Sequence, residues 1–220
     1  MDSNRRSLIT MEHPKFHVSE QYRTIRTNIE FSSIDKEIKT LLVVSPNAGE
    51  GKSTTAANVA AVFAQQGKKV LLVDVDLRKP TVHYTFQVEN TLGFTNVFTK
   101  QVKLEEAIKP TKQGNLFVLS SGPIPPNPSE MLGSSAMKEF ITTTQDMYDL
   151  IVFDAPPVIA VTDGVILASE VDGVLLVVRS GETEIKTIKK SKELLGNVNA
   201  RLLGVVLNGM ERESTSYYYG

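Results

Sequence analysis

A glycine-rich segment in the first quarter of the chain has the residue types needed to bind phosphate. It reads SPNAGEGKST over residues 45–54 and joins a Val-rich run to an Ala-rich one. Backbone N–H groups of such a turn, with the positive end of a following helix, bind anions. Lys52 can reach the outer phosphates of a nucleotide, and the Ser53 hydroxyl can bind Mg²⁺. The motif G-x-x-x-x-G-K-[ST] is met except at its first glycine, where Pro46 stands. The alternative is an ordinary glycine-containing turn between a strand and a helix.

Three aspartates follow apolar runs and supply carboxylates for the same chemistry. Asp74 and Asp76 stand two residues apart at the end of one run, and Asp154 ends a later run before Ala155. Hard cations prefer oxygen ligands, so such positions suit Mg²⁺. Strand-terminal aspartates are also common caps and turn formers. Three of them together with the glycine-rich segment favour the metal-binding interpretation.

Six short apolar runs must position these residues: 40–45, 69–74, 115–120, 149–154, 173–178 and 203–208. They are rich in Val and Leu with little alternation, which is typical of strands buried on both faces. Helices are expected over 52–66, closed by Gly67, and over 182–195, closed by Gly196. This order predicts an α/β fold, a mostly parallel β-sheet with helices on both faces. Ligands then bind beyond the carboxyl ends of the strands.

Segments outside these runs carry further predictions. A helix over about 19–33, capped by Ser19, would bury Tyr22, Ile25 and Ile29. Residues 121–129 hold four of the ten prolines and should form an ordered or semi-rigid loop. We expect a single domain over 1–210 and a flexible, tyrosine-rich tail over 211–220.

Composition limits the function classes. The 220 residues carry a formal net charge of -1, which gives no strong basic field for nucleic acid. No cysteine is present, which excludes disulfides, iron–sulfur clusters, thiolate zinc sites and cysteine nucleophiles. The sequence has no run of about 18 apolar residues and no signal-peptide pattern, so we expect a soluble, cytosolic protein.

Four motifs in order resemble the bacterial tyrosine kinases, relatives of the deviant P-loop ATPases of ParA and MinD type. The phosphate-binding segment is the first, and the second is D-x-D-x-R, matched by Asp74, Asp76 and Arg78. The third is a helix with E-x-x-R-x-x-R, matched by Glu20, Arg23 and Arg26, and the fourth is a C-terminal tyrosine cluster, Tyr217, Tyr218 and Tyr219. Partition ATPases carry a signature lysine where Asn47 stands, and iron-protein relatives need cysteines.

The resemblance implies a P-loop NTPase fold and roles for particular residues. ATP would be bound by Ala48, Gly49, Glu50, Gly51, Lys52, Ser53, Thr54 and Asn208, with Mg²⁺ held by Ser53, Asp76 and Asp154. Asp74 would orient or deprotonate a tyrosine hydroxyl, although spacing alone does not separate base from metal ligand. Arg78 would stabilise the transferring phosphate or pair with an aspartate. Asn208 would contact adenine or serve as a turn residue before Gly209.

The resemblance also implies partners. The chain would be the free-standing kinase subunit of Gram-positive capsule and exopolysaccharide systems, with cofactors ATP and Mg²⁺. It would form a homo-oligomeric ring through Glu20, Arg23 and Arg26. The alternative interpretation of these three residues is a solvated charged face. The subunits would autophosphorylate Tyr217, Tyr218 and Tyr219 in trans. A separate transmembrane adaptor would activate it at the inner face of the plasma membrane, and a phosphotyrosine phosphatase would reverse its action. The rival interpretations are a ParA/MinD-type regulatory ATPase and a slow nucleotide-binding scaffold.

Overall fold

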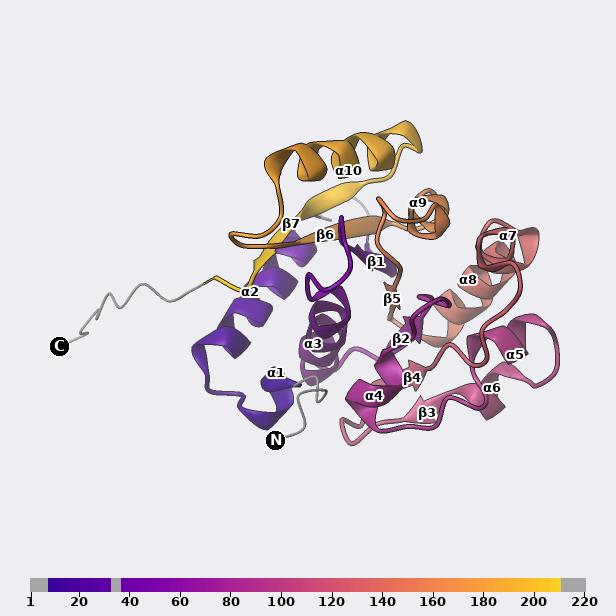
Figure 1. Ribbon diagram of the computed structural model, residues 1–220. Helices are drawn as coiled ribbons and strands as arrows, with labels where there is room; N and C mark the ends of the chain where they lie inside the picture. Colours follow the sequence, from indigo (N-terminus) through magenta and orange to yellow (C-terminus); the bar gives the residue numbers. More distant parts are fainter. Residues whose placement is uncertain (1–7, 33–36, 211–220) are drawn as a thin grey trace.

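A seven-stranded sheet runs through the middle of the structure (Figure 1). The computed structural model describes residues 8–32 and 37–210. The strands are β1 (Thr40–Val44), β2 (Val70–Asp74), β3 (Lys109–Pro110), β4 (Leu116–Leu119), β5 (Leu150–Asp154), β6 (Gly173–Arg179) and β7 (Leu202–Asn208). Their order across the sheet is β3-β4-β2-β5-β1-β6-β7, and every pairing except the antiparallel β3–β4 is parallel.

Helices cover both faces of this sheet (Figure 1). One face carries α1 (Ile9–Glu12), α2 (His17–Phe31), α3 (Lys52–Gln65) and α4 (Val82–Phe86). The other carries α5 (Phe94–Phe98), α6 (Leu104–Ala107), α7 (Pro128–Leu132), α8 (Ser135–Met147), α9 (Asp163–Ala168) and α10 (Ile185–Asn197). The predicted α/β class with a mostly parallel sheet is therefore confirmed.

The two hydrophobic cores divide the side chains of each central strand. In β1, Leu41 and Val43 pack beneath α3, whereas Leu42 and Val44 point into the opposite core. Every residue of β1, β2 and β5 is buried, as the near-continuous apolar runs predicted. The prediction is wrong for the edge strand β7, where Val205 and Leu207 are 52% and 50% exposed.

The bounds of two helices, α2 and α10, differ from the sequence predictions. Helix α2 begins at His17, so Ser19 is not its cap. The Ser19 hydroxyl instead donates to the carbonyl oxygens of His13 and Ile9 at 2.7 and 3.2 Å, which ties α2 to α1. Helix α10 begins only at Ile185 and continues through Gly196 to Asn197, because residues 180–184 form a turn that contacts the phosphate-binding segment.

The proline-rich segment is shorter as a loop than expected. It ends at Asn127, and Pro128 is the first residue of α7. Proline suits that position because its missing N–H would have no partner in the first turn of a helix. Helices α1 and α4 to α9 and the short strand β3 were not individually predicted. All of them except α8 span six residues or fewer, whereas the 13-residue α8 buries Met137, Phe140, Ile141 and Thr144 at a helical spacing that was missed.

The carboxyl ends of the parallel strands bring distant segments together. Strand β1, which leads into the glycine-rich segment, lies between β5 and β6. Asp74 at the end of β2 and Asp154 at the end of β5 are direct neighbours in the sheet register. Asn208 ends β7 beside Arg179 of β6. Within the described residues, no helix is long and apolar enough to span a bilayer.

Candidate active site

The glycine-rich segment forms a tight loop between β1 and the start of α3. Gly49 and Gly51 have φ values of +85° and +93°, in the left-handed region that favours glycine. A Cβ atom on Gly51 would also lie 2.0 Å from Asn208 Nδ2. The loop therefore requires glycine at position 51 for both its backbone conformation and its contact with β7.

The loop borders a cavity of about 730 Å³, a size typical of small-molecule sites. From the loop and α3, the lining residues are Ala48, Gly49, Gly51, Lys52, Ser53 and Thr54. Opposite them lie residues of the other strand ends and their loops: Asp76, Arg78, Lys79, Thr81, Pro156, Pro157, Ala160, Val161, Arg179 and Asn208. Lys79, Arg179 and the apolar wall 156–161 were not singled out from the sequence, since no motif marks them.

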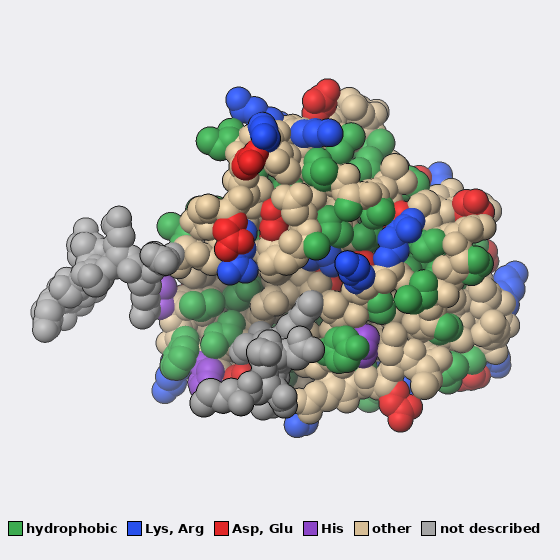
Figure 2. All heavy atoms as spheres, viewed as in Figure 1, with side chains coloured by type: hydrophobic (Ala, Val, Ile, Leu, Met, Phe, Trp, Pro, Cys, Tyr) green, Lys and Arg blue, Asp and Glu red, His purple; other side chains and the backbone are tan. Residues whose placement is uncertain are grey.

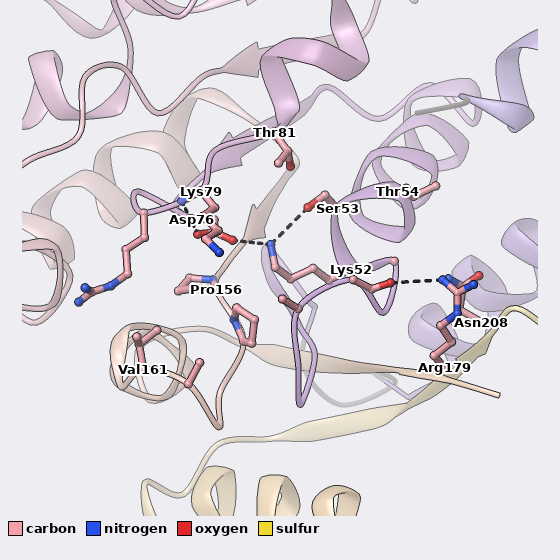
Figure 3. Close-up of a pocket in the computed structure, with 16 residues that line it drawn as sticks. Lys52, Ser53, Thr54, Asp76, Lys79, Thr81, Pro156, Val161, Arg179 and Asn208 are labelled. Atoms are coloured by element: carbon pink, nitrogen blue, oxygen red, sulfur yellow. Dashed lines mark hydrogen bonds and ion pairs between the residues drawn. The ribbon is translucent and has the colours of Figure 1, made fainter. Parts of the chain in front are cut away.

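Lys52 lies at the centre of a buried charged cluster (Figure 3). Its Nζ is 2.8 Å from Asp76 Oδ2 and 3.2 Å from Asp154 Oδ1, and it donates to Ser53 Oγ at 3.2 Å. Burial by itself would lower the pKa of Lys52, but the neighbouring carboxylates outweigh it and raise the pKa. The ammonium group therefore stays charged and links the loop to the ends of β2 and β5.

Asp74 is enclosed behind this cluster and does not line the cavity. Its Oδ2 accepts hydrogen bonds from the backbone N–H groups of Thr81 and Val82 at 2.8 and 2.9 Å, and its Oδ1 accepts from Asp76 N at 3.2 Å. Burial, together with the charge of Asp154, raises the pKa of Asp74 to about 7. Its carboxylate thus holds the start of α4 and the backbone that carries Asp76.

Asp154 has one carboxylate oxygen without a hydrogen-bond partner among the described residues. That oxygen, Oδ2, is buried, while Oδ1 accepts from Lys52. Burial raises the pKa of Asp154 against the opposing effect of Lys52. A buried, unpartnered carboxylate oxygen beside a serine hydroxyl and a second aspartate fits a hard divalent cation.

Arg78 pairs with Asp163, a residue that the sequence reasoning missed. Arg78 Nε and Nη2 lie 2.9 and 3.2 Å from the two carboxylate oxygens of Asp163, and the Ser129 hydroxyl donates to Oδ1 at 2.5 Å. Burial would raise the pKa of Asp163, but the hydrogen bonds from Arg78 and Ser129 hold it below its ordinary value. No motif marked Asp163 in the sequence, and α9, which it begins, was not predicted.

Asn208 and Arg179 lie together at the end of the cavity away from Asp76 (Figure 3). Asn208 Nδ2 donates to the carbonyl oxygen of Glu50 at 3.0 Å. Arg179 Nη1 lies 3.4 Å from the carbonyl oxygen of Gly49, and its Nε forms an ion pair with Glu182 at 2.7 Å. Both strand ends therefore brace the loop from the side opposite β5.

Cationic side chains surround the cavity. Arg78, Lys79 and Arg179 all line it. In the view of Figure 2, Lys and Arg side chains gather near the middle of the face, close to hydrophobic ones. Such a lining attracts an anionic ligand such as a nucleotide triphosphate.

The residues predicted for oligomer contact lie on α2 and are not among the residues that line the cavity. Arg23 hydrogen-bonds to Glu20 and to the carbonyl oxygen of Pro14 at 2.5 and 2.8 Å. Arg26 donates to the carbonyl oxygen of Val62 on α3 at 3.3 Å, and its side chain is 20% exposed. The tyrosine tail, Tyr217 to Tyr219, falls outside the described residues.

Comparisons with known proteins identify the family. A profile described as AAA domain matches residues 38–202. The tyrosine-protein kinase YwqD of Bacillus subtilis (strain 168) is 51% identical over 218 residues, covering 98% of this chain and 92% of that protein. The putative tyrosine-protein kinase CapB of Staphylococcus aureus is 41% identical over 214 residues, covering 96% and 94%.

A solved structure agrees with these sequence matches. The chimerical protein CapA2B2 superposes with a TM-score of 0.90 and 41% identity, covering 93% of this chain and 90% of that one. The expected P-loop NTPase fold is therefore confirmed. This chain belongs to the family of bacterial tyrosine-protein kinases.

Proposed function

We propose that this chain transfers the γ-phosphoryl group of ATP to tyrosine hydroxyls, including those of its own tail. The observation that carries the proposal is the contact of Lys52 with Asp76 and Asp154 at a cavity of nucleotide size. Phosphoryl transfer depends on positioning and charge neutralisation more than on covalent catalysis. This cluster supplies both in a chain whose relatives are named tyrosine-protein kinases.

ATP would lie along the cavity from Asn208 to Asp76. The N–H groups of the loop and Lys52 would bind the β- and γ-phosphates. Ser53 and Thr54 lie in the first turn of α3, whose positive end would face these phosphates. Asn208 and Arg179 would contact the nucleoside side, because they line the opposite end.

Ser53, Asp76 and Asp154 would hold Mg²⁺. Among the described residues, no group of three or more His, Asp or Glu side chains is arranged as a metal site by itself. That agrees with Mg²⁺, which is usually bound by one or two carboxylates together with substrate phosphates. The ion would neutralise charge on the phosphate oxygens.

For the carboxylate that faces the tyrosine hydroxyl, the resemblance implied Asp74. Asp74 is occupied by three backbone N–H groups and is closed off from the cavity, whereas Asp76 lines it. We therefore propose that Asp76 both contributes to the Mg²⁺ site and faces the hydroxyl, and that Asp74 holds the backbone between β2 and α4 in place. Arg78, fixed by Asp163, has its Nη1 free of hydrogen bonds to described residues and would contact the transferring phosphate.

The tail and its assembly complete the proposal. Tyr217, Tyr218 and Tyr219 would enter the site of a neighbouring subunit in a ring formed through Glu20, Arg23 and Arg26. Each phosphorylated tyrosine gains a charge of about −1.5 to −2, which beside the active-site carboxylates would expel the tail of this chain.

The proposed setting is capsule or exopolysaccharide production. The cytoplasmic segment of a membrane adaptor would activate the kinase at the membrane, and a phosphatase would remove the phosphate groups.

A phosphotyrosine assay tests the proposal. The chain is incubated with Mg·ATP, with and without a candidate adaptor tail, and probed for phosphotyrosine. We expect a signal that is lost in Lys52→Met and in the triple Tyr→Phe variant of residues 217–219, but kept in Lys190→Met on the exposed face of α10. Signal that survives Lys52→Met would overturn the P-loop assignment. Phosphate release without phosphotyrosine, unchanged by deletion of residues 214–220, would instead support a regulatory ATPase.

A further inference from the structure

The turn between β6 and α10 reaches the phosphate-binding loop through Thr183. The Thr183 hydroxyl accepts a hydrogen bond from Arg179 N at 2.8 Å and lies 2.7 Å from Glu50 Oε1. A hydroxyl has one hydrogen to donate, and a carboxylate can only accept. The Thr183 hydrogen must therefore point at Glu50, so the hydroxyl is fixed in both of its roles.

Glu50 places a negatively charged side chain within a loop that would bind anions. It is only 5% exposed and does not line the cavity. Its carboxylate accepts from Asn47 N at 3.0 Å, from Asn47 Nδ2 at 3.1 Å and from Thr183. These contacts close the turn from Asn47 to Glu50 and keep the carboxylate away from the cavity.

We propose that Thr183 is a positioning residue for nucleotide binding, acting through Glu50. Its hydroxyl holds the Glu50 carboxylate in the orientation that shapes the loop and removes that charge from the phosphate site. Asn208 supports the same residue from the other side, through the carbonyl oxygen of Glu50. The inference rests on the proposed function only in that the loop binds the phosphates of a nucleotide.

Calorimetric titration of the full-length chain with Mg·ADP tests the inference. Thr183→Val keeps the shape of the side chain and removes the hydroxyl, whereas Thr183→Ser keeps the hydroxyl. We expect Thr183→Val to weaken Mg·ADP binding about tenfold, since a hydrogen bond to a buried charge is lost. Thr183→Ser should bind within about twofold of wild type, as should the matched control Thr187→Val in the first turn of α10. Wild-type affinity in Thr183→Val, or equal weakening in Thr183→Ser, would overturn the inference.

Two further measurements separate positioning from a general loss of structure. In the kinase assay, Thr183→Val should raise the KM for ATP about tenfold and leave kcat within about twofold. A double-mutant cycle with Glu50→Ala, which removes the acceptor oxygen, should show that the two changes are less than additive, because they break the same contact. Additive effects would contradict the pairing even if Thr183→Val lowered the overall stability.

The outcomes also distinguish this inference from the proposed function. A wild-type chain that binds Mg·ADP but produces no phosphotyrosine would refute kinase activity and leave the role of Thr183 standing. A chain that phosphorylates normally, with an unchanged KM for ATP in Thr183→Val, would refute the role of Thr183 alone. A wild-type chain that does not bind Mg·ADP would refute both.

Discussion

Lys52 compensates the negative charge of a buried acidic cluster as well as facing the cavity. Its ammonium lies 2.8 Å from Asp76 and 3.2 Å from Asp154. Removing one partner of a buried ion pair leaves an uncompensated charge. We predict that Lys52→Met lowers the free energy of unfolding at pH 8, without Mg²⁺, by about 3 kcal/mol, as measured by urea denaturation.

The penalty in Lys52→Met should shrink as the pH falls toward 5. Burial raises the pKa of Asp154, and that of Asp74 to about 7, so these carboxyl groups take up protons and lose charge on acidification. The double variant Lys52→Met/Asp154→Asn should recover part of the lost stability while remaining inactive. A single Lys52→Met variant as stable as wild type at pH 8 would contradict this role.

Between elements, the Asp163 carboxylate joins three segments at the cavity rim. It receives hydrogen bonds from Arg78, after β2, and from Ser129 of α7, while it lies itself at the start of α9. Asp163 is fully buried, but the Arg78 side chain is 42% exposed, so solvent screens the pair. We predict that Asp163→Asn lowers the free energy of unfolding at pH 7 by about 1–2 kcal/mol. It should also lower kcat, because Arg78 loses its fixed orientation.

The pH dependence of that loss has a defined sign. Because the folded-state pKa of Asp163 is lowered, its stabilisation is present above its unfolded pKa, near 3.9, and is lost as the pH falls through the folded value. In urea denaturation, the loss in the free energy of unfolding of Asp163→Asn relative to wild type should be equal at pH 7 and pH 5. It should be smaller at pH 3. The exposed Asp146→Asn on α8 is the matched control and should show no such difference. A difference that grew toward pH 3 would refute the assignment.

For the whole molecule, the two arginines of α2 should differ in their effects on assembly. The Arg26 side chain is held against α3 through the carbonyl oxygen of Val62, whereas the Arg23 side chain hydrogen-bonds to Glu20 and to the carbonyl oxygen of Pro14. If a ring forms through α2, Arg23→Ala should dissociate it and leave the stability of the subunit unchanged. Arg26→Ala should dissociate it and also lower the free energy of unfolding by about 1 kcal/mol.

Sedimentation of both variants beside wild type, with urea denaturation of each, checks the prediction. Lys190→Ala on the exposed face of α10 is the control for loss of a surface cation. An assembly that persists in Arg23→Ala would remove α2 from the proposed contact.

The sequence predicted most of the sheet and part of the site for one physical reason. Strands buried on both faces have continuous apolar runs, and the residues that end them stand out at the run boundaries. That pattern located Asp74, Asp154 and Asn208 at the edge where the structure places them. It failed at β7, where a strand at the edge of the sheet keeps an apolar sequence while Val205 and Leu207 stay half exposed.

Residue types and order by themselves determined the α/β class, the phosphate-binding loop and the likeness to tyrosine kinases, because each depends on neighbours along the chain. Tertiary structure alone decided that Arg78 is fixed by Asp163 and that Thr183 holds Glu50. Arg78 and Asp163 are 85 residues apart, and Glu50 and Thr183 are 133 apart. Side-chain orientation across such separations depends on how the strands are ordered in the sheet, and local spacing carries no record of that order.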